Sequence, residues 1–523
     1  MRRKIPRTMS TQHPDNASIP EWAGDSIIHG EAEIYEAYFA YRELGCMEVM
    51  WDAEGKDVDT RVVRKLLEKY GEYFKEKVLG EDVFLTYRVP NPKVDVADQK
   101  ILLESLVNIP VAYDIASRFY QRNVTPMFEV ILPFTTRSDD LIWLKRYYEK
   151  VIAGSASVCL DGVCKVEEWL GPFRPETIEI IPLIEDMKSI LGIKEIITPF
   201  IKAAKPEYLR VFIARSDPAL NYGLVCAVIL CKIALSQLKH VEDSIGVSIY
   251  PILGVGTMPF RGHLSPQNMG SFAEEYKGVY TVTIQSALKY DYPIDEVRNV
   301  VAFLNENLPT GKPAIIESHE AEALTGVLTK FMRRYQSIVE KIAPLINNIA
   351  ALVPPRRARK LHIGLFGYSR SVGRISLPRA IPFACALYTL GIPPEFIGFS
   401  VLEDLNEVEW NTLRNHYLNL KHDLEAAGVF ISWRNLNLLS EMCELAAKVS
   451  GVKSGDLRSA IADIISDLNI VEENLAIKLG PRNFTQMKHE NAINNFLVSY
   501  FDGNNEEAKR HLLEAARIRR CLG

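Results

Sequence analysis

Short apolar runs recur along the chain, and several are rich in Val and Ile, as buried parallel strands are. Helically spaced patterns lie between most of them, for example at residues 60–77 and 138–152. The second pattern opens with Ser138 as a predicted N-cap, followed by Asp139 and Asp140 in the first turn. The predicted strands are residues 47–50, 83–86, 127–132, 178–183, 209–214, 248–253, 279–284 and 361–366. Strands alternating with helices in this number favour an α/β fold, a TIM-like (β/α)₈ barrel.

Longer helical patterns take over after about residue 395. They cover residues 404–427, 435–449, 456–479 and 505–521. No Gly-, Ser- or Pro-rich linker separates them from the preceding chain. We therefore predict one domain over residues 1–523. Residues 1–395 are its approximate barrel with an N-terminal arm, and residues 396–523 are a helical extension packed on that barrel.

Charge and cysteine usage narrow the class of protein. The 523 residues carry a net charge of −5, and the basic residues are scattered, which argues against nucleic-acid binding or a polybasic membrane patch. The eight cysteines show neither zinc-ribbon nor Cys-x-x-Cys spacing, so we interpret them as mostly buried thiols in a reducing compartment. The basic start lacks the apolar stretch of a secretory signal, and uncharged runs near residues 222–235 and 379–395 are interrupted. A cytoplasmic location is predicted.

Two predicted strands lead directly into carboxylates. Glu185 follows residues 178–183, and Asp217 follows residues 209–214. Strand exits line the active site of a TIM barrel, and Mg²⁺ is usually bound by one or two carboxylates beside substrate and water. The alternative is that each acid only caps a turn or helix, as Asp217 before Pro218 suggests. Arginines also follow strands, and their planar fork suits carboxylate and phosphate, so the pattern indicates an anionic substrate with a metal.

Several motifs resemble archaeal-type phosphoenolpyruvate carboxylase over essentially the whole chain. They are STQHPDN at residues 10–16, WDAEGKDV at 51–58, YRVPNP at 87–92, FRG at 260–262 and the closing Leu522-Gly523. Shorter islands resemble the longer bacterial and plant enzymes. These are His13-Pro14, PLIE at residues 182–185, Ser216-Asp217 and LPRAIPF at residues 377–383.

The resemblance implies an irreversible carboxylation of phosphoenolpyruvate by bicarbonate to oxaloacetate and phosphate, which replenishes C4 dicarboxylic acids. It proceeds through carboxyphosphate and the enolate of pyruvate. Glu185 and Asp217 are expected to bind Mg²⁺, or Mn²⁺ in its place. His13 is the expected general base. Arg88, Arg261 and Arg379 are expected in catalysis and substrate binding, with Arg370 and Arg374 as further substrate-binding residues. The family also implies a cytoplasmic homotetramer.

The chain departs from the longer enzymes in one loop. Where those carry F-H-G-R-G-G, residues 260–265 read FRGHLS, so either Arg261 or His263 faces the substrate. We favour Arg261 because its charge is fixed. The roles of Asp52, Glu54 and Lys56 stay open. Two other functions also remain open, a lyase of the pyruvate-kinase-like group and a regulatory barrel that binds phosphoenolpyruvate without turning it over.

Overall fold

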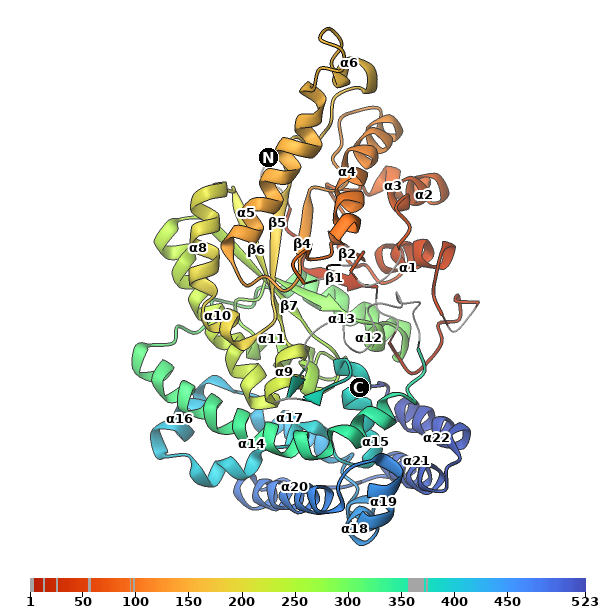
Figure 1. Cartoon of the computed structure of the whole chain (residues 1–523), viewed down its shortest axis with the longest axis vertical. Coiled ribbons are helices and arrows are strands. Elements are labelled where there is room, and N and C mark those ends of the chain that lie inside the picture. Colours follow the sequence, from red (N-terminus) through yellow and green to blue (C-terminus); the bar gives the residue numbers. More distant parts are fainter. Residues whose placement is uncertain are drawn as a thin grey trace.

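The computed structural model is built around a closed barrel of eight parallel strands (Figure 1). It describes residues 4–12, 15–24, 27–54, 58–94, 96, 99–355, 371–372 and 375–523. The barrel strands are β1 (Thr8–Thr11), β2 (Glu48–Asp52), β3 (Phe84–Arg88), β4 (Glu129–Leu132), β5 (Glu179–Ile184), β6 (Tyr208–Ala214), β7 (Ser248–Gly254) and β8 (Thr281–Ile284). Each strand pairs with its sequence neighbours, and β1 pairs with β8. The predicted TIM-like barrel is confirmed.

One barrel strand differs from the predicted set. Strand β1 pairs in parallel with both β2 and β8 and so holds the eighth place in the barrel. Its sequence, TMST, is too polar to stand out as an apolar run, although all four residues are buried. Residues 361–366, which the apolar pattern predicted as the eighth strand, lie outside the described residues. The other seven predicted strands agree with the structure to within two residues.

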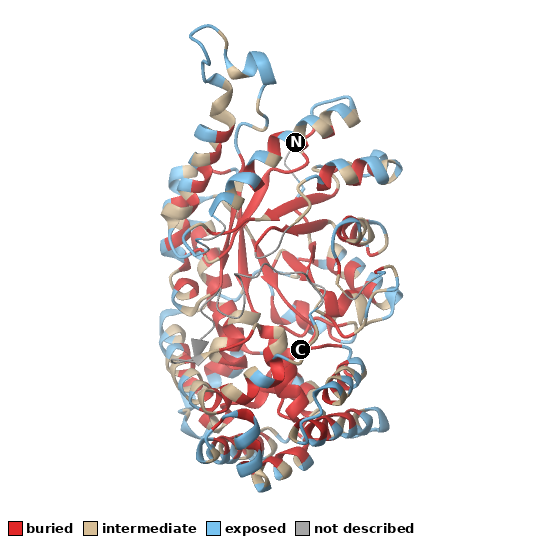
Figure 2. Ribbon diagram, turned by 45° about the vertical axis from the view of Figure 1, so that its right-hand side comes forward, coloured by how far each residue is buried: buried red, intermediate tan, exposed pale blue. Residues whose placement is uncertain are grey.

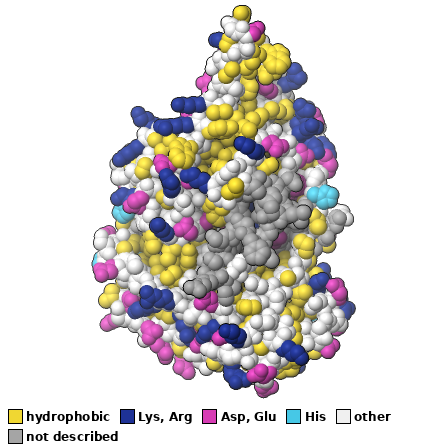
Figure 3. Space-filling view, in the orientation of Figure 1, with side chains coloured by type: hydrophobic (Ala, Val, Ile, Leu, Met, Phe, Trp, Pro, Cys, Tyr) yellow, Lys and Arg dark blue, Asp and Glu magenta, His cyan; other side chains and the backbone are white. Residues whose placement is uncertain are grey.

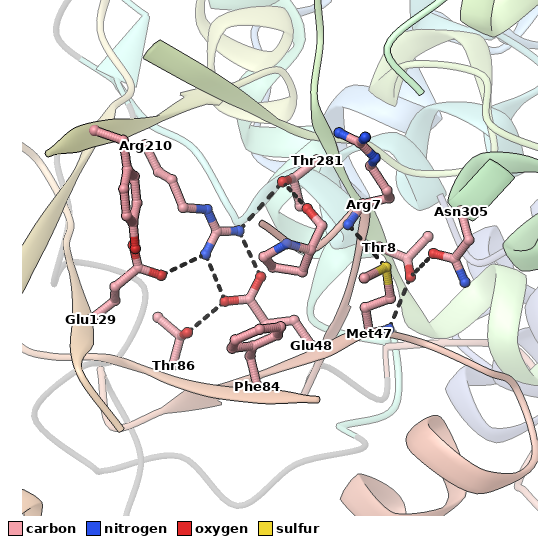
Figure 4. Close-up of polar contacts among 12 residues, drawn as sticks. Arg7, Thr8, Met47, Glu48, Phe84, Thr86, Glu129, Arg210, Thr281 and Asn305 are labelled. Atoms are coloured by element: carbon pink, nitrogen blue, oxygen red, sulfur yellow. Dashed lines mark hydrogen bonds and ion pairs between the residues drawn. The ribbon is translucent and has the colours of Figure 1, made fainter. Parts of the chain in front are cut away.

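The barrel interior has an apolar layer and a polar layer. The apolar layer includes Met9, Met50, Ile181 and Ile252 from four different strands. At the amino ends of the strands, Arg210 donates to Glu48 and Glu129, at 2.7 to 2.9 Å (Figure 4). All three side chains are buried, and the two carboxylates share the single positive charge of Arg210. This network fills the end of the barrel opposite the acidic strand exits.

Helices surround the barrel. Those between residues 31 and 307 are α1 (Glu31–Arg42), α2 (Val62–Lys69), α3 (Gly71–Glu76), α4 (Gln99–Tyr120), α5 (Ser138–Tyr147), α6 (Val166–Leu170), α7 (Met187–Leu191), α8 (Ile193–Ala204), α9 (Ser216–Tyr222), α10 (Leu224–Ile245), α11 (Met269–Glu275), α12 (Ser286–Tyr290) and α13 (Ile294–Asn307). The pattern at 60–77 corresponds to α2 and α3. The predicted cap of α5 was wrong by one residue, because Ser138 is already helical and the extended residue before it is Arg137. The helix continues as a π-helical turn over Tyr148–Ile152.

A layer of helices lies at one end of the barrel (Figure 1). It contains α14 (Ser318–Ala350), α15 (Ala380–Leu390), α16 (Glu407–His416), α17 (Leu420–Gly428), α18 (Trp433–Glu441), α19 (Cys443–Ser450), α20 (Ser454–Leu475), α21 (Phe484–Phe501) and α22 (Asn505–Ile518). The four helical patterns of the C-terminal third all fall on these helices. The longest helix, α14, packs against α10, α15, α16 and α20 and so joins the barrel to the layer. A two-stranded sheet, β9 (Ser371–Val372) with β10 (Ile375–Ser376), precedes α15.

Helix α10 covers most of the uncharged run near residues 222–235, which the sequence analysis judged too interrupted to span a membrane. By length and composition it meets the requirements of a membrane span, despite Lys232. However, 78% of its most apolar window is buried inside the molecule, as in a core helix. Figure 2 shows the same concentration of buried residues in the barrel and in the helix faces that pack on it. The hydrophobicity of α10 is therefore explained by its packing against the barrel and α14.

Candidate active site

A cavity of about 130 Å³ opens at the carboxyl ends of the barrel strands, where helix α15 covers them. Five predicted site residues line it, namely Arg88, Glu185, Asp217, Arg261 and Arg379. They come from β3, β5, α9, the loop after β7 and the start of α15. The remaining predicted site residues, His13, Arg370 and Arg374, lie outside the described residues. The fold thus brings together two carboxylates and three guanidinium groups that are far apart in the sequence.

The two carboxylates form an acidic wall. Glu185 follows β5 and is 8% exposed, and its Oε2 accepts a hydrogen bond from the main-chain N–H of Phe134 at 2.7 Å. Burial raises the pKa of Glu185 to about 8, and the negative charges of Asp217 and Glu54 contribute to the increase. In the part of the chain that the structure describes, no three His, Cys, Asp or Glu side chains are grouped to hold a metal. A cation bound by Glu185 and Asp217 would take its remaining ligands from substrate or water.

Arg88 is already neutralised by carboxylates. Its Nε lies 2.7 Å from Oδ1 of Asp52 and 3.0 Å from Glu54, and its Nη2 donates to Oδ2 of Asp52 at 2.8 Å. Asp52 and Arg88 are direct partners in the pairing of β2 with β3. These carboxylates raise the pKa of Arg88, even though its burial acts in the opposite direction. Asp52 and Glu54, whose roles the sequence left open, therefore fix and charge-balance Arg88. Lys56 lies outside the described residues.

Arg261 faces the cavity, whereas His263 is turned away from it. The Arg261 guanidinium donates to Ser216 Oγ at 3.1 Å, to Gln285 Oε1 at 2.5 Å and to the main-chain oxygen of Gly523 at 3.0 Å. Burial lowers its pKa from the usual value for arginine. The His263 ring is bound instead to Asp423, with Nδ1 and Oδ1 2.6 Å apart. The placement agrees with the choice of Arg261 over His263.

Two buried polar side chains support the short helical turn that carries Arg261, η3 (Pro259–Arg261). Arg215 donates to the main-chain oxygens of Phe260 and Pro259 at 3.0 and 3.3 Å. Oε1 of Glu395 accepts hydrogen bonds from the Phe260 N–H at 2.9 Å and from the Tyr388 hydroxyl at 2.7 Å. Arg215 lines the cavity as well, but its hydrogen bonds to Phe260 and Pro259 hold the turn in place. Neither supporting role is visible in the sequence, because both contacts join distant segments.

Glu395 makes the folded protein sensitive to pH. Burial raises the pKa of its carboxyl to about 7, from an ordinary value near 4.5, so the folded state retains the proton longer than the unfolded state does. The stabilisation from this proton is complete below about pH 4.5 and is lost as the pH rises to about 7. In Glu395→Gln the loss is absent, so the variant gains roughly 3 kcal/mol relative to wild type across this window. Denaturant unfolding at several pH values tests this, and parallel pH profiles for the two proteins would contradict it.

Helix α12 anchors the N-terminal arm from two sides. Lys289 donates to Ser10 Oγ at 3.1 Å and to the main-chain oxygen of Thr11 at 2.7 Å. The Asp291 carboxylate, just beyond the helix, accepts from the Ala17 and Ser18 N–H groups at 2.8 and 2.7 Å. The described residues on each side of positions 13 and 14 are thus fixed to the same helix.

Arg379 enters the cavity from the helical layer. It immediately precedes α15 and is half-buried. Its guanidinium forms no hydrogen bond or ion pair with the residues that the structure describes. Arg379 therefore has more donor capacity for an anionic ligand than Arg88, whose fork is held by carboxylates. Other cavity-lining residues to which the sequence analysis gave no role are Thr11, Asp15, Glu54 and Thr283.

The family model and the curated relatives that match this chain carry the same description. Residues 5–523 match the family model described as phosphoenolpyruvate carboxylase. Curated proteins of that name are 49% identical in Caldivirga maquilingensis and 47% identical in Metallosphaera sedula, each over 100% of both chains. The one from Picrophilus torridus is 43% identical over 99% of both. Among solved structures, the magnesium/glyoxylate complex of Haloferax volcanii malate synthase aligns with 88% of this chain and 99% of its own, at 11% identity. Its TM-score of 0.35 is too low to support an argument.

Proposed function

We propose, because the chain belongs to the phosphoenolpyruvate carboxylase family, that it converts phosphoenolpyruvate and bicarbonate to oxaloacetate and phosphate. It is then a carboxy-lyase, and its product replenishes C4 dicarboxylic acids. The observation that carries the proposal is the cavity at the strand exits, which combines the carboxylates of Glu185 and Asp217 with the guanidinium groups of Arg261 and Arg379. A metal and a doubly anionic substrate need this combination of charges.

The acidic wall fits a hard divalent cation. Glu185 and Asp217 supply oxygen donors. The pKa of Glu185 is raised mainly by burial and further by the negative charges of Asp217 and Glu54, and a bound cation would offset that repulsion. Mg²⁺, or Mn²⁺ in its place, requires such ligands and takes its remaining ones from substrate and water. When bound, the cation supplies Lewis-acid stabilisation of the negative charge that develops on the substrate.

The arginines act on the substrate anions. Arg261 and Arg379 bind the phosphoryl and carboxylate groups of phosphoenolpyruvate and keep their charge throughout the reaction. A bicarbonate oxygen attacks phosphorus, and the bond between phosphorus and the enol oxygen breaks, which yields carboxyphosphate and the enolate of pyruvate. Arg88 remains a proposed catalytic and substrate-binding residue, and Asp52 and Glu54 hold its guanidinium at the cavity wall. Arg370 and Arg374 remain proposed substrate-binding residues.

His13 is the proposed general base of the second step. It takes the proton from carboxyphosphate, whose carbon–oxygen bond to phosphate then breaks to release CO₂ and phosphate. The enolate carbon attacks the CO₂ and forms oxaloacetate. The anchoring of residues on both sides of position 13 to Lys289 and Asp291 supports a role for this arm, because a fixed arm loses less entropy on positioning a base.

A cytoplasmic homotetramer is part of the proposal. All eight cysteines are free thiols and six of them are buried, which suits a reducing compartment. Residues 153–170 form a projecting arm whose Trp169 and Leu170 are 71% and 57% exposed, and such apolar surface favours association between copies (Figure 1).

The test is the bicarbonate dependence of product formation by the purified protein. We expect oxaloacetate and phosphate in equal amounts from phosphoenolpyruvate, only when bicarbonate and Mg²⁺ are both present. Malate dehydrogenase and NADH detect the oxaloacetate, and a phosphate assay gives the second product. Turnover of phosphoenolpyruvate without bicarbonate would indicate a pyruvate-kinase-like lyase instead. Binding of phosphoenolpyruvate without turnover under all conditions would indicate a regulatory barrel.

A further inference from the structure

A second cavity, of about 340 Å³, lies outside the barrel between helices α4 and α5. Its volume falls in the range of about 300–1,000 Å³ typical of small-molecule sites. The walls are mainly apolar, with Leu103 from α4, Trp143 and Tyr147 from α5, and Leu132 at the end of β4. Trp143 is 54% exposed and Leu103 37%. Figure 3 shows hydrophobic side chains gathered on this face, below the projecting arm. A bound molecule would cover large apolar side chains that the chain itself leaves in water.

The described residues that line this α4–α5 pocket include two lysines and one aspartate. Lys93 lies 4.5 Å from the centre of the Trp143 ring and forms an ion pair with Asp140. Lys100, in the first turn of α4, also lines the pocket and forms no ion pair with any residue in the described part of the chain. Among the described residues that line the pocket, two lysines stand against one aspartate, which leaves one positive charge beside an aromatic surface. The complementary ligand is a planar apolar molecule that carries an acidic group.

The pocket shares a loop with the barrel cavity. Asn91, in the pocket wall, donates through Nδ2 to the main-chain oxygens of Pro133 at 2.9 Å and Phe134 at 3.4 Å. On the other side of this loop, the N–H of Phe134 donates to Glu185, and Phe134 lines the barrel cavity. Phe134 has a φ of +50°, a conformation that a bulky residue adopts only when its surroundings impose it. A ligand that moves Asn91 therefore changes the support of Glu185.

We propose that the α4–α5 pocket is an effector site for a small planar anion, with its apolar body against Trp143 and its acidic group at Lys100. Occupancy acts on the barrel cavity through Asn91, Phe134 and Glu185. The binding site stands on its own contacts, whereas the effect on activity rests on the proposed function.

The binding experiment uses 8-anilinonaphthalene-1-sulfonate, a fluorescent planar anion, and N-phenyl-1-naphthylamine, which has the same rings without the sulfonate. We expect Trp143→Ala to weaken binding of the sulfonate about tenfold or more. Lys100→Ala should remove the preference for the sulfonate over the neutral probe. Trp169→Ala is the matched control, because this exposed tryptophan lies in the projecting arm and not in the pocket. Equal binding by wild type and Trp143→Ala would overturn the site.

Two further measurements separate the remaining outcomes. Sedimentation velocity of Trp143→Ala shows whether the oligomer persists, and its dissociation would make the pocket a contact between copies, which overturns the proposal.

In the wild type, saturating sulfonate should shift the Mg²⁺ concentration for half-maximal activity at least threefold, and Asn91→Ala should reduce this shift. An unchanged Mg²⁺ dependence in the wild type would overturn the coupling. Probe binding is measured without turnover. The binding result therefore tests the pocket even if the catalytic proposal fails.

Discussion

Glu185→Gln and Asp217→Asn are each expected to lower the carboxylation rate at fixed Mg²⁺ on the order of a hundredfold or more. Each change removes one negative charge from the acidic wall and keeps the shape of the side chain. A cation that depends on two protein carboxylates then loses half of its protein charge. Initial rates over a range of Mg²⁺ concentrations measure the effect. Binding of Mn²⁺, followed by the electron paramagnetic resonance signal of the free ion, should weaken in parallel.

Asp186→Asn is the matched control for these variants. Asp186 is adjacent to Glu185, but its carboxylate caps helix α7 by accepting the Ser189 N–H at 2.9 Å, and it does not line the cavity. Asparagine is an equally good N-cap, so this variant should keep its activity and its Mn²⁺ binding. If Glu185→Gln bound Mn²⁺ as tightly as Asp186→Asn and retained full activity, the assignment of the metal ligands would be wrong.

The strand pattern predicted most of the barrel because seven strands are mainly apolar. Buried parallel strands pack against the interior and the surrounding helices, so hydrophobicity marks them along most of their length. Strand β1 could not be found in this way. Thr8, Ser10 and Thr11 are buried in polar surroundings, where Thr8 Oγ1 donates to Asn305 at 2.8 Å and Ser10 accepts from Lys289. Those partners are more than 270 residues away in the sequence, and no local pattern reports them.

For the described residues, the sequence could predict that several site residues lie near one another, but it could not predict their contacts. Placing Glu185, Asp217, Arg88 and Arg261 at strand exits was enough to bring them into one cavity, because parallel strands of a barrel end on the same face. The neutralisation of Arg88 depends on the register of β2 and β3, which sets Asp52 directly opposite it. Arg379 comes from outside the barrel strands, so only the family resemblance pointed to it.

His13→Asn is expected to separate the two chemical steps of the proposed reaction. Phosphoryl transfer to bicarbonate needs the acidic wall and the arginines, so the variant should still consume phosphoenolpyruvate. Without the base, carboxyphosphate keeps its proton, and the enolate is protonated instead of carboxylated. Pyruvate and phosphate should therefore form in a bicarbonate-dependent manner, while oxaloacetate formation falls about a hundredfold or more, the usual contribution of a general base. Lactate dehydrogenase and malate dehydrogenase, each with NADH, measure the two keto acids separately.

His29→Asn is the control for this experiment, since His29 is an exposed histidine of the same N-terminal region and should give wild-type products. Substantial oxaloacetate from His13→Asn would exclude His13 as the required base. Loss of phosphoenolpyruvate binding would make it a binding residue. The contacts of Lys289 with Thr11 and of Asp291 with Ala17 do not involve the substituted side chain. The substitution should therefore leave the anchored parts of the arm in place, so a change in product identity would report on proton transfer and not on displacement of the arm.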